Sequence, residues 1–215
     1  RIITGIAWDH INVFSNFDEY VEQFRKFINT SPKSGTLIYN STDKLLSKVL
    51  KKSEIRDDVN QVSYEPHKHK IADGNTVLID ADKNKHAIKL FGEHNMMNIN
   101  AAFNVCIKIG VTAEQFYASL KDFKGADMRL QLVANKNSYK TFRDFAHAPS
   151  KVEATVNAVK AQFSKEKLIA CVELHTFSSL SKDFLPQYKD TLKKADKALV
   201  YFKPEILANK KLPNI

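Results

Sequence analysis

Four groups of polar side chains in this sequence lie where strands are expected to end or helices to begin, which is where binding and catalytic groups gather in α/β proteins. The groups are Asp9 with His10, the run His94, Asn95 and Asn98, Asp144 with His147, and His175. An imidazole can bind a metal ion or transfer a proton, and a carboxylate can accept hydrogen bonds from ribose hydroxyls. Three polar groups at strand ends indicate a site more strongly than any one of them alone.

The stretch from Gly92 to Ala102 opens an apolar helix with neutral hydrogen-bonding side chains, which suit an uncharged polar ligand. Asn95 and Asn98 are three residues apart, so on a helix they share one face. His94 and Asn95 stand where the first backbone N–H groups lack partners. Asn has poor helix propensity, so its repeated use here indicates capping or binding, and capping explains Asn95 better than Asn98.

Structural interpretations of the other groups stay open. Asp144 suits a helix cap or turn as well as a ribose contact, and His147 suits a partly buried polar position as well as proton transfer. His67 and His69 alternate as metal ligands on a strand would. We instead expect an exposed basic loop there, because Pro66, Lys68 and Lys70 surround them.

The composition is that of an ordinary globular protein. Of 215 residues, 43% are hydrophobic and 27% charged, and no apolar run approaches the about 18 residues of a membrane span. Cys106 and Cys171 lie in apolar segments, which predicts buried, reduced thiols in a cytoplasmic protein. The start Arg1-Ile2-Ile3 lacks an initiator Met and a signal sequence, so we expect a piece cut from a longer chain.

The formal net charge of +9 would attract phosphate-bearing ligands or nucleic acid. The lysines are scattered, however, and aromatic residues do not interleave with them as in single-strand binding surfaces. A non-catalytic nucleotide- or nucleic-acid-binding module is therefore the weaker alternative to an enzyme. Covalent hydrolase chemistry has no support, because neither a Gly-x-Ser-x-Gly elbow nor a Cys with a nearby His is present.

Strands and helices are expected to alternate along the first part of the chain. Hydrophobic periodicity predicts strands at 2–7, 36–40, 61–66, 76–82 and 86–91, and helices at 17–30, 42–53, 95–109 and 113–122. Ser41 or Thr42 is the expected cap of the second helix. Residues 82–85 are expected to join the last two strands as a hairpin.

The pattern resets near residues 123–127, where we place a domain boundary. A hairpin-like pair at 128–134 and 139–145 follows, then a helix from Pro149, a buried parallel strand at 168–174, a helix at 185–195 and a buried strand at 198–202. The predicted fold class is α/β, with a doubly wound, Rossmann-like second domain. The predicted domains are residues 1–124 and 125–215.

The motifs together resemble, in order and spacing, those of the Mur ligase family. The resemblance rests on Asp9-His10 after an apolar strand, the stretch 92–102, Met128-Arg129, and the run 144–149. It implies that residues 1–124 are the later part of a central ATP-binding domain and that 125–215 belong to an incomplete C-terminal domain. No Gly-x-x-x-x-Gly-Lys-Ser/Thr phosphate loop is present, so we expect that loop upstream and little activity from this stretch alone.

The resemblance implies ATP-dependent amide formation with ATP and Mg²⁺ as cofactors: a carboxylate is phosphorylated, and an amine then attacks the acyl phosphate. By motif match, the implied roles are a magnesium ligand at His10, adenine contacts at His94, Asn95 and Asn98, nucleotide contacts at Arg129 and Asp144, and an incoming amine facing His147 with His175 nearby. The implied substrate partners are UDP-N-acetylmuramate and an amino acid or peptide.

Within the family, the chain looks most similar to the alanine-adding and the tripeptide-recycling ligases. It departs from the alanine-adding pattern at Arg143, Phe145 and Ala148, and after His175 at residues 176–179, where two arginines are replaced. Losing them should change how a substrate carboxylate is held, because bidentate guanidinium pairing is hard to replace. We therefore favour a tripeptide over alanine. Some members carry a carbamylated lysine after the Asp-His pair, and the nearest position here is Arg25, which predicts that this device is absent.

Overall fold

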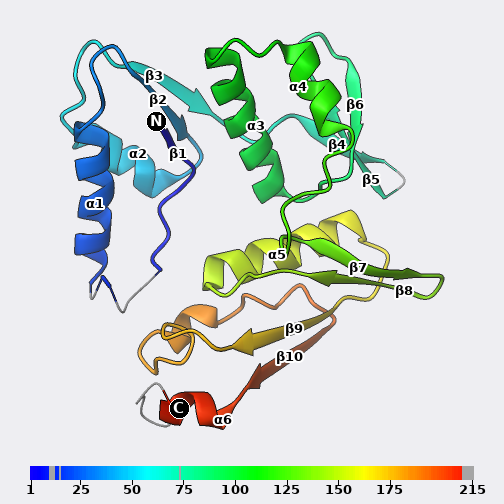
Figure 1. Ribbon diagram of the computed structural model, residues 1–215. Helices are drawn as coiled ribbons and strands as arrows, with labels where there is room; N and C mark the ends of the chain where they lie inside the picture. Colours follow the sequence, from blue (N-terminus) through cyan, green and yellow to red (C-terminus); the bar gives the residue numbers. More distant parts are fainter. Residues whose placement is uncertain (10–12, 15, 73, 210–215) are drawn as a thin grey trace. The chain divides into compact units, whose positions relative to one another are not determined.

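The computed structural model describes residues 1–9, 13–14, 16–72 and 74–209 (Figure 1). Its backbone contacts divide the chain into two compact units. The first unit comprises residues 1–70, 78–86 and 93–121, and the second comprises 71–77, 87–92 and 122–215. None of the helices in the described ranges is long and apolar enough to cross a membrane.

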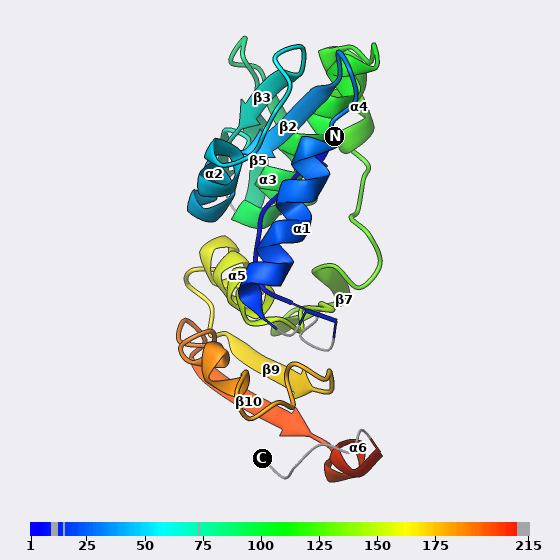
Figure 2. The same ribbon diagram turned by 90° about the vertical axis from the view of Figure 1, so that its left-hand side faces the viewer.

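The first unit is built on a parallel sheet with helices on both faces, so the α/β fold class is confirmed. The strands lie in the order β1 (Ile2–Ile3), β2 (Thr36–Asn40) and β3 (Asn60–Tyr64). The helices are α1 (Phe17–Asn29), α2 (Lys44–Lys51), α3 (Glu93–Lys108) and α4 (Ala113–Leu120). In Figures 1 and 2, α1 and α2 cover one face of this sheet and α3 covers the other.

Side-chain alternation along β2 explains why the sheet is covered on both faces. Leu37 is 0% exposed and packs with Ile28 of α1 and Leu46 of α2. Its neighbour Ile38 points to the opposite face and packs with Ala101 of α3. A strand that is apolar at successive positions can be stable only between two helical layers.

The cap of α2 differs from the prediction of Ser41 or Thr42. The helix begins at Lys44, and the Asp43 carboxylate caps it by accepting hydrogen bonds from Leu45 N and Leu46 N, both at 2.9 Å. Its second oxygen accepts a hydrogen bond from Ile6 N at 2.7 Å. Asp caps a helix as well as Ser does, and Asp43 also satisfies a second segment of the chain. The first strand is shorter than the predicted range of 2–7, because β1 ends at Ile3.

A second sheet has the strand order β4 (His69–Ala72), β5 (Asn75–Ile79) and β6 (Lys85–Ile88). The neighbouring strands β5 and β6 confirm the predicted pair, whereas β4 was not expected. The expected exposed basic loop is also wrong at His67, which is only 6% exposed and lies 2.8 Å from the Tyr117 hydroxyl through Nε2. Burial lowers the pKa of His67 and favours its neutral form. Tyr117 comes from α4, fifty residues away, so local polarity could not reveal this burial.

The described part of the second unit contains two small sheets and two α-helices. β7 (Gln131–Lys136) and β8 (Tyr139–Arg143) form the predicted antiparallel hairpin, and α5 (Pro149–Gln162) begins at Pro149 as expected. β9 (Ile169–Leu174) and β10 (Lys197–Phe202) pair in parallel, and α6 (Pro204–Asn209) follows.

Three predictions for the second unit are wrong. β9 and β10 are parallel but largely exposed, with Ile169 at 64% and Val200 at 59%. They form a sheet of only two strands, and a cavity of about 510 Å³ lies along β9 in place of packed side chains. Exposure of Cys171 follows from this, while Cys106 is partly buried and both thiols are free.

The expected helix at 185–195 is the third error. Only a single 3₁₀ turn forms there, at Leu185–Tyr188. Asp190 then takes a left-handed backbone conformation with φ of 64°, which ends any helical continuation. The hydrophobic spacing after Pro186 was therefore a misleading helix signal.

Candidate functional site

Three predicted site residues of the second unit lie around one aromatic ring, that of Phe145. The guanidinium carbon of Arg129 is 5.6 Å from the centroid of this ring. The ring centroids of His147 and His175 lie 5.0 Å and 6.2 Å from it, and 6.5 Å from each other. Residues from three separate sequence motifs therefore meet at one place, which the sequence alone indicated only through the resemblance.

Asp144 holds the loop that carries Arg129. Its Oδ2 accepts a hydrogen bond from Leu130 N at 2.8 Å, and its Oδ1 accepts one from Ala146 N at 2.7 Å. Met128 and Leu130, on either side of Arg129, have φ angles of 55° and 45°. Left-handed conformations are unfavourable for such residues and persist only where the surroundings hold them. The carboxylate thus serves first as a turn residue, and its remaining lone pairs are still able to accept hydrogen bonds.

Both histidines are oriented by backbone carbonyl groups. Nδ1 of His147 lies 3.0 Å from the carbonyl oxygen of Phe145, and Nδ1 of His175 lies 3.3 Å from that of Glu173. A carbonyl oxygen only accepts, so Nδ1 carries the hydrogen in each pair and the neutral ring keeps its lone pair on Nε2. Each imidazole therefore presents Nε2 as its basic nitrogen.

Sequence reasoning missed the residues that support these histidines. The hydroxyl of Tyr188 donates a hydrogen bond to the carbonyl oxygen of His147. Behind His175, Thr176 N donates to Ser179 Oγ at 2.9 Å, and Ser179 N donates to Thr176 Oγ1 at 3.0 Å. Ser and Thr turns of this kind can be recognised in a sequence. Here they indicate that residues 176–179 form an ordered loop.

The remaining predicted contacts lie in the first unit, at the start of α3. Gly92 precedes the helix with φ of 91°, a conformation that side chains rarely adopt. Met96 and Ile99 are buried, His94 and Asn95 are half-buried, and Asn98 is exposed.

The asparagines of α3 divide into two kinds. Asn100 Nδ2 donates to the carbonyl oxygen of Glu65 at 2.7 Å, and Asn104 Nδ2 donates to that of Asn100 at 2.8 Å. These two amides hold the local structure. The exposed Asn98 is not committed in this way, which leaves its amide accessible to a ligand.

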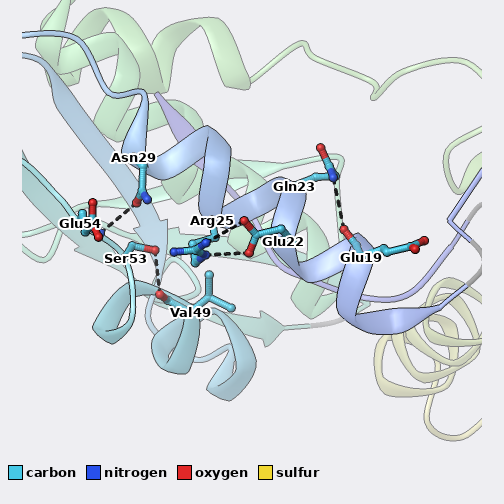
Figure 3. A network of polar contacts seen from close by, with 8 residues as sticks. All are labelled: Glu19, Glu22, Gln23, Arg25, Asn29, Val49, Ser53 and Glu54. Carbon is cyan, nitrogen blue, oxygen red and sulfur yellow. Dashed lines mark hydrogen bonds and ion pairs between the residues drawn. The ribbon is translucent and has the colours of Figure 1, made fainter.

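Arg25 is engaged on the surface of α1. Its Nε and Nη2 donate to the two carboxylate oxygens of Glu22 at 2.7 Å and 2.8 Å, and Figure 3 shows this paired arrangement. The hydrogen bonds and the positive charge lower the pKa of Glu22. Arg25 thus forms a surface ion pair within α1, and the expected absence of the carbamylated-lysine device stays a prediction.

The predicted magnesium ligand, His10, lies outside the described residues. Within the described ranges, no three His, Cys, Asp or Glu side chains form a group that could hold a metal ion. Mg²⁺ that is bound to a nucleotide needs only one or two protein ligands, because phosphate oxygens and water supply the others. A magnesium site of this kind therefore does not depend on such a group of side chains.

Comparison with known proteins shows which family the chain resembles. Residues 1–106 match the Mur ligase middle domain. The UDP-N-acetylmuramate–L-alanine ligase of Caldicellulosiruptor bescii is 30% identical over 212 residues, which cover 93% of this chain and 45% of that protein. The chain thus spans a little under half the length of this curated relative.

Solved structures of similar fold cover both units. That of the UDP-N-acetylmuramate-alanine ligase from Thermotoga maritima matches 98% of this chain and 48% of its own, with a TM-score of 0.65 and 17% identity. The murein peptide ligase from Psychrobacter arcticus matches 97% of this chain and 46% of its own, with a TM-score of 0.55 and 21% identity. Over nearly all of its length the chain is thus similar to Mur ligases, and its first 106 residues match the middle domain of that family.

Proposed function

We propose that this chain is part of an ATP-dependent ligase that joins an amino acid or peptide to UDP-N-acetylmuramate through an amide bond. The observation that carries the proposal is the meeting of Arg129, His147 and His175 around Phe145 in a chain similar to Mur ligases. A cation and two imidazoles at one place suit a reaction that develops negative charge on a phosphoryl group and removes a proton from an amine.

The roles follow from the chemistry of each group. ATP bound with Mg²⁺ supplies the phosphoryl group that activates the substrate carboxylate. Arg129 carries a permanent positive charge suited to phosphoryl oxygens. An attacking ammonium group must first lose a proton, and an imidazole nitrogen of His147 or His175 can accept it. Because ATP is the activating cosubstrate, we propose that the reaction takes place in the cytoplasm.

We further propose that the start of α3 contacts adenine through His94, Asn95 and Asn98, that Asp144 contacts the nucleotide, and that His10 binds Mg²⁺. The half-buried and exposed polar positions on α3 support the first role. The free lone pairs of Asp144 support the second. We assign residues 1–124 to the ATP-binding domain and 125–215 to the C-terminal domain.

The amine substrate is the finer part of the proposal. The named relative that shares 30% identity is an alanine ligase, which supports alanine. The sequence Thr176-Phe177-Ser178-Ser179, in contrast, offers no guanidinium to hold the carboxylate of a free amino acid and supports a larger peptide. We favour the tripeptide as the amine substrate, with alanine as the alternative.

The function is tested by measuring ADP release from the full-length protein with UDP-N-acetylmuramate, ATP and Mg²⁺. We expect release that depends on added alanyl-glutamyl-diaminopimelate tripeptide and is much weaker with alanine. The reverse preference would establish the alanine ligase instead. Absence of release with either substrate, in protein that binds ATP, would refute the ligase proposal.

The Asn98→Ala variant tests the adenine contact. The exposed amide contributes little to folding, so the variant should keep its melting temperature while the KM for ATP rises roughly tenfold, the effect of losing about 1.4 kcal/mol of binding. Asn104→Ala is the matched control, because its amide bonds within α3. A stability loss at Asn98 with unchanged KM for ATP would show that this residue caps or supports the helix instead.

A further inference from the structure

Phe145 has contacts that neither packing nor the proposed reaction steps explain. Its side chain is 41% exposed, so it is not part of the hydrophobic core. Its backbone is nevertheless held on both sides, because its N donates to the carbonyl oxygen of Met128 at 2.8 Å and its own carbonyl accepts from Nδ1 of His147. A half-exposed aromatic residue is thus fixed at the end of the loop that follows β8.

The ring touches three polar side chains that come from different segments. Arg129 lies against it as a cation near a π-system, with 5.6 Å between guanidinium carbon and centroid. The His147 ring meets it edge to face at an interplanar angle of 64°, and the His175 ring is tilted at 47°. The two histidine rings also lie within ring-contact distance of each other, at 6.5 Å between centroids, and Phe145 is the neighbour that they share with Arg129.

We propose that Phe145 is a positioning residue whose ring sets the places of Arg129, His147 and His175 relative to one another. The kinetic consequence of this inference rests on the proposed function. The placing of the three side chains by Phe145 does not depend on that function.

The ring itself, rather than its volume or a hydroxyl group, carries this role. Phe145 has no hydroxyl, so none of the contacts is a hydrogen bond from its side chain. The interaction with Arg129 needs the electron-rich face of the ring, and the edge-to-face contact with His147 needs its quadrupole. Leucine would preserve bulk but lose both, whereas tyrosine would preserve both.

The test compares Phe145→Ala, Phe145→Leu and Phe145→Tyr, with Tyr139→Ala as control. Tyr139 is a similarly exposed aromatic residue of β8 that makes none of these contacts. NMR spectra of protein labelled at histidine should show that the His147 and His175 resonances move in the alanine and leucine variants and stay close to wild type in the tyrosine variant and the control.

The kinetic measurement uses the full-length protein and the amine-dependent release of ADP. Displaced groups slow the chemical step, so Phe145→Ala and Phe145→Leu should lower kcat roughly tenfold to a hundredfold. Phe145→Tyr should restore kcat. A leucine variant with wild-type kcat and unmoved histidine resonances would overturn the positioning role.

The two proposals fail in different ways. A wild-type protein that shows no amine-dependent release would refute the ligase function, while the histidine resonances would still decide whether Phe145 positions its neighbours. An active wild type together with unmoved resonances in Phe145→Ala would refute the positioning role and leave the ligase function standing. Melting curves of each variant exclude unfolding as the cause, because an exposed ring contributes little to the core.

Discussion

Replacing Asp144 with alanine is expected to lower the stability of the second unit by about 2–3 kcal/mol and to abolish most of the ligase activity that we propose for the full-length protein. The carboxylate accepts hydrogen bonds from the backbone at Leu130 and Ala146, and bonds to a charged acceptor are among the stronger ones in proteins. Without it, Met128 and Leu130 have less reason to keep their left-handed conformations. Arg129, between them, would then lose its place beside Phe145.

Hydrogen exchange at single amides measures this effect directly. In Asp144→Ala, the amides of Leu130 and Ala146 should exchange much faster, while those of α3 in the first unit keep their rates. Asp144→Asn should lie between wild type and alanine, because one of its two side-chain positions still accepts a hydrogen bond.

Asp127→Ala is the matched control, since this exposed residue has only a distant pairing of 3.8 Å with Arg143. Surface pairs of this kind contribute little to stability. If Asp144→Ala left the Leu130 amide protected and ADP release unchanged, the carboxylate would not be holding the Arg129 loop.

Elements with strong periodicity could be predicted from the sequence almost residue by residue. The apolar spacing of α1 and the short apolar run of β2 gave bounds within one residue of the observed ones. The pattern of each element depends on neighbours close in sequence, and the two elements are separated by recognisable breakers, Pro32 after α1 and Gly35 before β2.

Burial was less predictable, because it depends on partners far along the chain. His67 was expected to be exposed beside lysines, yet Tyr117 and Phe103 surround it. The apolar run of β9 was expected to be buried, yet a two-stranded sheet leaves much of it exposed. Local hydrophobicity indicates whether a segment can be buried, whereas its actual exposure depends on which other segments cover it.

The candidate site shows the same division. The types of Arg129, His147 and His175 could be singled out by their motifs, but their common neighbour Phe145 could not. Its importance comes from contacts among segments that are 16 to 30 residues apart in sequence, as from Arg129 to Phe145 and from Phe145 to His175. Such contacts follow from the tertiary fold and leave no periodic signal.

Replacing Asp43 with alanine is expected to destabilise the first unit by about 2–4 kcal/mol, the sum of a lost helix cap and of a buried Ile6 N–H left without its acceptor. The carboxylate joins Leu45 and Leu46, at the start of α2, to Ile6 beyond β1. Gly5 lies so close that an added Cβ would be 3.2 Å from Asp43 Oδ2, which indicates that the two segments are tightly joined. Urea unfolding curves measure the loss of unfolding free energy. Hydrogen exchange of the Ile6, Leu45 and Leu46 amides in the folded protein shows where protection is lost.

Two further variants separate the contributions of the Asp43 carboxylate. Asp43→Asn keeps an acceptor for α2 but places an amide NH₂ group opposite the Ile6 N–H, so the cap should survive while Ile6 loses protection. Asp57→Ala removes an exposed charge of the same unit and should leave stability within about 0.5 kcal/mol of wild type. If the Ile6 amide exchanged equally slowly in Asp43→Ala and in wild type, the segment after β1 would be held in place without its hydrogen bond to Asp43. The expected loss would instead show that one residue couples the helix start to the segment leading toward Asp9, and hence toward the proposed magnesium ligand.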